Sequence, residues 1–165
     1  MLERLQSTLA AIKNKLLRDE LIRKLLINDF PAALHTEVPE LSEHDLDKYI
    51  VLRPVFDFEN KKNYNQNSVI NMYITDIDPI ENTKGINAVI QINVVCNQDV
   101  WNLDENQIRP LVIADRIITL INNVKFTASN KIFLNSLTDL IINKKMFGYA
   151  LLFTITDGSA DIDKF

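Results

Sequence analysis

Residues 68–157 contain four segments in which apolar and polar residues alternate, arranged as two pairs around one helical pattern. The clearest segment is residues 88–96, where every second residue is apolar, and this period is typical of a strand with one buried face. Residues 68–75 alternate in the same way, and a turn segment from Asp78 to Gly85 separates the two. The two segments are therefore predicted to form an antiparallel hairpin. The apolar face of the clearest segment consists of Ala88, Ile90, Ile92, Val94 and Cys96.

A second hairpin and the helix that precedes it complete this pattern. Residues 131–143 are predicted as a strand and residues 147–155 as its partner, with a short turn between them. The helix is predicted to begin at Asp104, because Gln107 follows three residues later as in a capping box. Pro110 falls in the first turn, where proline is tolerated. The predicted buried face consists of Val112, Ile113, Ile117, Leu120 and Ile121, and the helix ends near Asn122 and Asn123.

Residues 1–28 have the three- and four-residue spacing of apolar side chains that is typical of an amphipathic helix. A second apolar stripe after Asp19 is offset from the first, and Asp19 can cap a new helix. The segment is therefore two helices, or one helix with a kink near Arg18. The short repeat favours a helix that lies on its own sheet over a coiled-coil contact with another subunit. The first stripe consists of Leu2, Leu5, Leu9, Ile12 and Leu16.

Residues 29–67 form an acidic segment that three prolines interrupt. Residues 49–52 and 55–58 are predicted as short edge strands, because the proline between them cannot donate to a ladder. Residues 60–67 are a polar loop without core-forming side chains. We interpret the whole segment as an elaboration of one domain, because it has too little apolar periodicity for a core of its own. The prolines are Pro31, Pro39 and Pro54.

Together these elements predict a single α+β domain over residues 1–165. Its order is a helical segment (1–28), the acidic insert (29–67), a sheet-and-helix core (68–157) and an acidic tail (158–165). A four-stranded, mainly antiparallel sheet of two hairpins, with helices packed on one face, buries the apolar faces of all these elements.

Charge and apolar content exclude several classes of protein. The formal net charge is −4 and the isoelectric point is near 5.2, which does not suggest general nucleic-acid binding. One cysteine excludes an internal disulfide framework. The N-terminal segment lacks the features of a secretion signal, and the apolar runs are far shorter than the roughly 20 residues of a membrane helix. We therefore expect a protein that is made and kept in the cytoplasm, or assembled there into something larger.

The sequence contains no constellation that is typical of catalysis. His35 and His44 both lie in the acidic insert and lack a second group to orient them. Three scattered glycines exclude a phosphate-binding loop, and Cys96 falls on an apolar strand face. Asp76 and Asp78 form a pair that is common at strand-to-turn junctions. We therefore expect no enzymatic activity and no cofactor.

The tail has the alternate acidic spacing that begins a calcium loop. Ile162 stands at the sixth position, where such a loop requires glycine, and the sequence does not supply the twelfth-position ligand. We therefore expect acidic surface and no metal. The residues with this spacing are Asp157, Ser159, Asp161 and Asp163.

The order of segments resembles that of phage tail terminator and tail-completion proteins, the head–tail joining proteins of the neck. The resemblance rests on the strand 88–97, the helix 108–121 and the closing strand 147–157, and it covers residues 68–157. It implies a structural virion protein that forms a ring, commonly a hexamer. Such a ring caps the tail tube, joins it to the head connector and lets DNA pass through its lumen without specific binding. The acidic insert has no counterpart in this resemblance.

A ring subunit needs contacts with its neighbours, and two hairpin tips are candidates. The tip with Asn82 and Lys84 and the tip with Lys144 and Lys145 are predicted to contact other subunits or partners. Trp101 either closes one end of the core, which we favour, or anchors a partner, since tryptophan is enriched at interface hot spots.

Two other functions remain open from the sequence. The first is a protein–protein adaptor that binds one partner through the apolar stripe of its N-terminal helix. The second, which the sequence favours less, is a metal-dependent phosphodiesterase that uses Asp76, Asp78 and a further acid.

Overall fold

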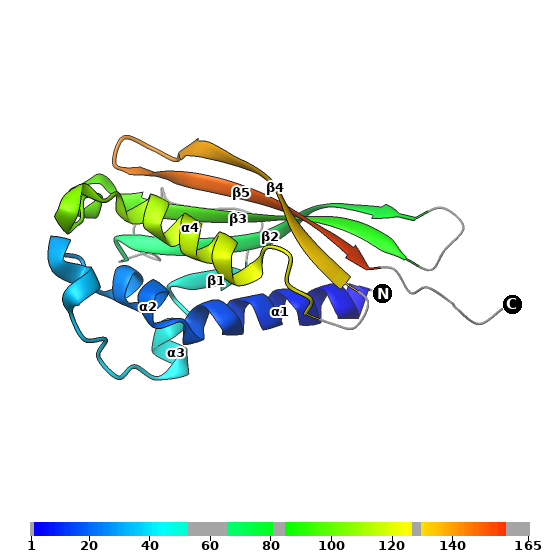
Figure 1. The fold of residues 1–165 in the computed structure, drawn as a ribbon, viewed down its shortest axis with the longest axis horizontal. Coiled ribbons are helices and arrows are strands. Elements are labelled where there is room, and N and C mark those ends of the chain that lie inside the picture. Colours follow the sequence, from blue (N-terminus) through cyan, green and yellow to red (C-terminus); the bar gives the residue numbers. More distant parts are fainter. Residues whose placement is uncertain (1, 53–65, 81–84, 127–129, 158–165) are drawn as a thin grey trace, which may run out of the picture.

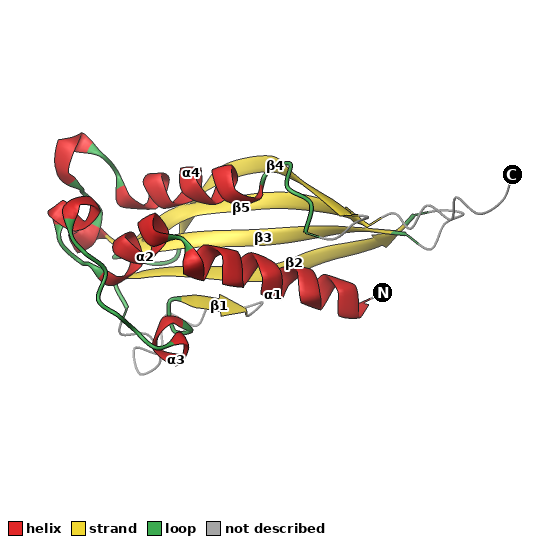
Figure 2. Ribbon diagram, turned by 60° about the horizontal axis from the view of Figure 1, so that its bottom comes forward, coloured by secondary structure: helices red, strands yellow, loops and turns green. Residues whose placement is uncertain are grey.

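The computed structural model describes residues 2–52, 66–80, 85–126 and 130–157. Its centre is a mixed five-stranded sheet with the strand order β1-β2-β3-β5-β4. The helices α1 (Leu2–Arg18), α2 (Glu20–Ile27) and α4 (Arg109–Ile121) lie on one face of this sheet (Figures 1 and 2). The α+β class and the packing of helices on one face are therefore confirmed.

Four long strands form two antiparallel pairs, as predicted, and β3 joins the pairs through β5. The prediction of a four-stranded sheet is wrong by one strand, because β1 pairs with β2 and runs parallel to it. Ile50 in β1 is fully buried beside Ile70, and three residues were too few for the sequence to assign their pairing. The strands are β1 (Ile50–Leu52), β2 (Ser68–Pro79), β3 (Ile86–Asn97), β4 (Asn130–Ile141) and β5 (Met146–Asp157).

The N-terminal segment is two helices, α1 (Leu2–Arg18) and α2 (Glu20–Ile27). Asp19 separates them and caps α2, because its carboxylate accepts a hydrogen bond of 3.0 Å from the backbone amide of Ile22. The other carboxylate oxygen of Asp19 accepts hydrogen bonds of 3.0 and 2.7 Å from Arg116 in α4. One side chain thus sets the corner between α1 and α2 and fixes it to α4.

The apolar stripe of α1 is buried within the domain, as the favoured interpretation predicts. Its buried members from Leu5 to Leu16 pack in the space between helix and sheet, and only Leu2 is exposed, at 60%. A partner-binding role for this helix would need that stripe to be free. In the part of the chain that the structure describes, no helix is long and apolar enough to cross a membrane.

The central helix α4 (Arg109–Ile121) begins later than predicted. Asp104 is not its N-cap, because Glu105 and Asn106 have φ angles of 61° and 59° and the chain cannot continue as a helix through them. Residues Asp104–Asn106 form a short 3₁₀ turn instead, and Ile108 is the cap. Pro110 does lie in the first turn, and the predicted end at Asn122 is confirmed.

The acidic insert joins the common core. It forms a 3₁₀ turn (Pro31–His35), the short helix α3 (Glu43–Leu46) and β1. Ala33, Leu46 and Ile50 are buried. The predicted strand 55–58 and residues 60–65 of the predicted loop lie outside the described residues.

The main core fills the space between the helices and the sheet, and it contains four of the five residues of the predicted apolar face, Ile90, Ile92, Val94 and Cys96. The fifth, Ala88, is buried in a smaller cluster with Leu5 and Ile86. The opposite face of the sheet carries a smaller apolar cluster of Val69, Val95 and Met146. Beside it, the amide of Asn93 donates a 2.9 Å hydrogen bond to Asn71 and accepts one of 2.8 Å from Gln91. Both faces of the central strands are thus fixed by side-chain contacts.

Candidate subunit interface

Strand β4 is the terminal strand of the sheet, because β5 is its only partner among the described strands. It is twelve residues long, whereas the other terminal strand, β1, has three. A terminal strand presents backbone donors and acceptors to any chain that can pair with them. The register shift between Leu134 and Ser136 places one bulge in β4, at Asn135, and bulges of this kind interrupt continuous pairing.

Three large apolar side chains of β4 are exposed along this border, and we call them the β4 edge surface. The register places Leu137 and Ile141 on one face of the sheet, opposite Leu151 and Phe147, and Phe133 on the other face. Ile141 is 72% exposed, whereas Phe133 and Leu137 are about 40% exposed. Exposed apolar groups that recur along one terminal strand are typical of contact surfaces between proteins. This strand therefore has the two properties of an assembly interface, unpaired backbone and apolar side chains.

The structure brings three of the predicted contact residues to the same end of the sheet as Ile141. Lys144 and Lys145 are exposed in the β4–β5 turn, and the carbonyl of Lys145 accepts a 2.8 Å hydrogen bond from Gln98. Trp101 lies in the segment that follows β3 and is half-buried. Its ring packs edge-on against Phe147, which pairs with Ile141, at 6.1 Å between centroids.

Trp101 thus packs at the end of the core while part of it stays accessible. Asn82 and Lys84, the other predicted contacts, lie outside the described residues. The candidate interface consists of the β4 edge surface with the lysine turn and Trp101 at one end.

Arg109 holds this end of the molecule together, although no motif in the sequence singles it out. Its side chain is fully buried and donates hydrogen bonds to four backbone carbonyls. Nε donates to Val100 and Nη1 to Leu25, each at 2.6 Å. Nη1 also donates to Asn28 at 2.6 Å, and Nη2 donates to Phe30 at 2.9 Å. The residue thereby joins the end of α2 to the segment between β3 and α4.

The charge of Arg109 is stabilised by backbone dipoles. Burial lowers the pKa of Arg109 from its ordinary value. Three of its four acceptors lie at or just after the C-terminus of α2, where the helix dipole favours a cation. The backbone amide of Arg109 also donates a 2.8 Å hydrogen bond to the carbonyl of Trp101, so this anchor positions the tryptophan. In the sequence, the signal for this anchoring role is the position of Arg109, a cation directly before Pro110 at the start of an apolar helix.

The residues considered for chemistry do not converge in the structure. His35 and His44 are exposed on different elements. Asp76 and Asp78 are exposed near the end of β2, and a carboxylate oxygen of Asp76 accepts a hydrogen bond from the next backbone amide. Among the described residues, no group of three or more histidine, cysteine, aspartate or glutamate side chains is placed to hold a metal ion. Ser159, Asp161 and Asp163 lie outside the described residues.

Comparison with known families identifies the chain over most of its length. The model of the YomW family matches residues 19–155. The chain belongs to the YomW family. YomW is a phage-derived family, which indicates a bacteriophage origin. No curated protein shows significant sequence similarity to the chain.

The YomW match begins at the residue that caps α2 and ends within β5. It therefore includes Asp19, Arg109, the complete β4 edge surface and the lysine turn. Helix α1 precedes the matched range.

Cys96 gives this YomW-family protein a thiol that we expect to be inert. Burial raises the pKa of Cys96 to about 12, so the thiolate is scarce at neutral pH. We expect no reaction of the native protein with a disulfide reagent at about pH 8, and rapid modification of one thiol in denaturant. A native thiol that reacts as fast as the unfolded one would contradict the buried placement.

Proposed function

We propose that the chain is a non-enzymatic virion protein whose copies form a ring that caps the phage tail tube. The ring would join the tube to the head connector and leave a lumen for DNA. The β4 edge surface carries this proposal, because it lies on a long terminal strand whose outer edge has no partner among the described strands and which carries three exposed apolar side chains. The phage origin of the family and the resemblance to tail terminators support it.

The two borders of the sheet are unlike, which suits a ring. A head-to-tail contact joins two different surfaces of the same chain and closes when the rotation between copies is right. Here one border is the twelve-residue β4 and the other is the three-residue β1 with the helices beside it. Contact between unlike borders would bury the β4 edge surface of each copy.

The charge of the chain also suits a DNA channel. The formal net charge is −4. Phosphate contacts from lysine and arginine dominate affinity for DNA, so an acidic wall binds the duplex weakly and lets it slide. A strongly basic lumen would slow passage.

Replacing Ile141 by glutamate is expected to prevent self-association. The substitution puts a charge at the most exposed apolar side chain of the proposed contact, where burial without a partner costs several kcal/mol. Light scattering across a concentration range, with negative-stain images, measures the outcome for the free protein and for the protein mixed with tail tubes. We expect the unchanged protein to form rings of about six copies, the size that the resemblance to tail terminators implies, and Ile141→Glu to stay monomeric.

Leu2→Glu is the matched control, because Leu2 is similarly exposed but lies at the start of α1. Its rings should persist. Rings that survive in Ile141→Glu, or a native protein that stays monomeric even on tail tubes, would refute the proposal.

A further inference from the structure

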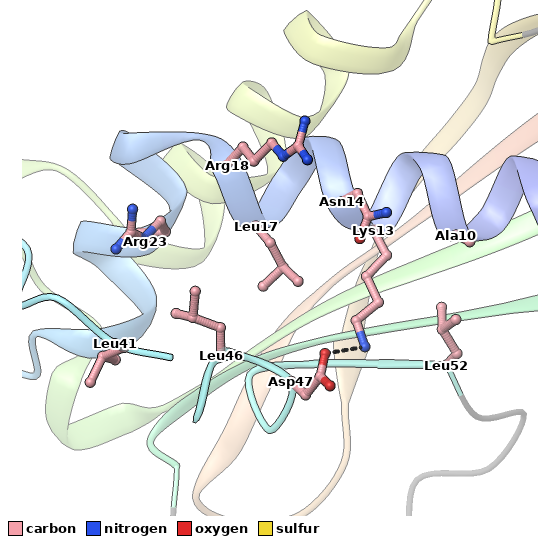
Figure 3. Close-up of a pocket in the computed structure, with 10 residues that line it drawn as sticks. All are labelled: Ala10, Lys13, Asn14, Leu17, Arg18, Arg23, Leu41, Leu46, Asp47 and Leu52. Atoms are coloured by element: carbon pink, nitrogen blue, oxygen red, sulfur yellow. Dashed lines mark ion pairs between the residues drawn. The ribbon is translucent and has the colours of Figure 1, made fainter. Parts of the chain in front are cut away.

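A cavity of about 600 Å³ lies between α1, α3 and β1, and α2 also contributes to its lining (Figure 3). This volume is within the roughly 300–1,000 Å³ of ligand sites in proteins. Four leucines from different elements form its apolar part, and we call the cavity the leucine groove. In Figure 3, Leu17 and Leu46 point toward one another across it. The four residues are Leu17, Leu41, Leu46 and Leu52.

The groove carries an excess of positive charge. Three cations line it, against the single anion Asp47. Lys13 is paired with Asp47 at 2.7 Å, which leaves Arg18 and Arg23. Neither guanidinium makes a hydrogen bond or ion pair in the part of the chain that the structure describes. A protein with a net charge of −4 therefore has, among its described residues, two cations without a bonded anion around one cavity that is partly lined by leucines.

One donor in the groove is buried and unsatisfied. The Nε of Arg23 is inaccessible to solvent and has no acceptor among the described residues. A buried donor without a partner costs roughly 1–3 kcal/mol, more when the group is charged. Arg109 shows the contrast within the same molecule, because each of its three guanidinium nitrogens donates to a carbonyl. The described residues of the groove thus supply no hydrogen-bond acceptor for the Nε of Arg23.

We propose that the leucine groove binds a segment of a partner protein that combines apolar and acidic side chains. The apolar side chains fill the cavity among the leucines, and separate carboxylates accept hydrogen bonds from Arg18 and from the accessible nitrogens of Arg23, which Figure 3 shows apart from one another. A carboxylate and a guanidinium form charge-assisted hydrogen bonds that are about twice as strong as neutral ones. The leucines favour a peptide over a nucleic acid, which would offer phosphates but little apolar surface.

The groove includes Leu52 of β1, so it lies at the border of the sheet that would receive β4 of the next copy in the proposed ring. The Ile141→Glu protein, which is expected to stay monomeric, leaves this border free. Binding measured with that variant therefore tests the groove whether or not the ring forms, and the two proposals can fail separately.

The test measures the fluorescence anisotropy of a labelled short peptide that combines leucine and glutamate, titrated with the full chain. A peptide with glutamine in place of glutamate and an oligothymidylate are the comparison probes. We expect the glutamate peptide to bind. The glutamine peptide should bind about tenfold more weakly for each carboxylate–guanidinium pair that it cannot form. The oligothymidylate should not compete.

Variants then assign the binding to the groove. Arg18→Gln combined with Arg23→Gln should weaken binding of the glutamate peptide by about tenfold or more. Lys15→Gln combined with Lys125→Gln changes the net charge equally outside the groove and outside the candidate interface, and it should leave binding unchanged. Leu52→Ser tests the apolar part at an exposed position and should weaken both peptides. Circular dichroism checks that each variant is folded.

Three results would overturn the proposal. The first is that the glutamate peptide does not bind. The second is equal binding of the glutamate and glutamine peptides, which would mean an apolar contact only. The third is competition by the oligothymidylate that the arginine variant abolishes, which would make the groove a phosphate site. The titration is repeated with Ile141→Glu, which is expected not to assemble. A result that is the same for this variant and for the unchanged chain concerns the groove and not ring assembly.

Discussion

Replacing Arg109 by methionine is expected to lower the free energy of unfolding by about 3–5 kcal/mol. Methionine fills much of the same space, so the effect comes mainly from the hydrogen bonds that the variant cannot make. The substitution removes the donor from four buried or half-buried backbone carbonyls, and water cannot easily replace it. Chemical denaturation followed by circular dichroism measures the change.

Arg116→Met is the matched control for this experiment. It makes the same substitution on the same helix, but Arg116 is 37% exposed and pairs with Asp19. We expect a loss of about 1 kcal/mol or less, as for other partly exposed ion pairs. Arg109→Lys should be intermediate or worse, because an ammonium group cannot reach the four acceptors of a planar guanidinium. Equal losses for Arg109→Met and Arg116→Met would show that Arg109 is not the anchor.

Replacing Gly148 by alanine is expected to destabilise the protein by about 3 kcal/mol or more. Gly148 lies in β5 opposite Val95 of β3. A Cβ atom at Gly148 would overlap the carbonyl oxygen of Val94 and lie 2.8 Å from its carbonyl carbon. Because both groups belong to the backbones of central strands, neither can move without breaking the ladder between β3 and β5.

Ala150→Gly is the comparison for this strand. Ala150 lies two residues further along β5, on the same face, and already carries a Cβ atom without conflict. Its replacement by glycine should cost only about 0.5–1 kcal/mol, mainly in backbone entropy. Thermal unfolding of both variants, followed by circular dichroism, measures the loss of stability that the close approach of β3 and β5 causes at Gly148. A Gly148→Ala protein as stable as Ala150→Gly would mean that β3 and β5 lie further apart than the structure places them.

Periodicity predicted the elements of this fold that depend on local sequence. The alternation in residues 88–96 identified the core face of β3, and the offset of the apolar stripes at Asp19 identified the break between α1 and α2. Both patterns reflect which side chains face the core, so they can be seen in the sequence itself. The hairpins and the end of α4 follow from the same kind of signal.

Features that depend on contacts between distant segments could not be predicted in this way. The pairing of β1 with β2 depends on the burial of Ile50, which the sequence of a three-residue strand does not show. The start of α4 depends on positive φ angles at Glu105 and Asn106, residues that also suit a helix cap.

In the candidate sites, too, local sequence signals predicted some residues, whereas contacts between distant segments determine the others. Lys144 and Lys145 were predicted from a local turn signal, and Trp101 from its residue type. Three of the four acceptors of Arg109 lie some 80 residues earlier in the chain, so no local pattern could reveal them. The leucine groove likewise takes its lining from α1, α2 and β1 and from the segment around α3 between them. Such sites exist only after the chain has folded.

The position of β5 between β3 and β4 has a consequence for the nascent chain. A ribosome releases β3 and β4 before the strand that must lie between them. Until β5 emerges, β4 has no partner and β3 has one unpaired border, which are the conditions in which strands associate wrongly. Translation that pauses before Met146 would therefore leave β3 and β4 exposed with unpaired backbone groups. We expect the cell's chaperones to bind the polypeptide at that stage.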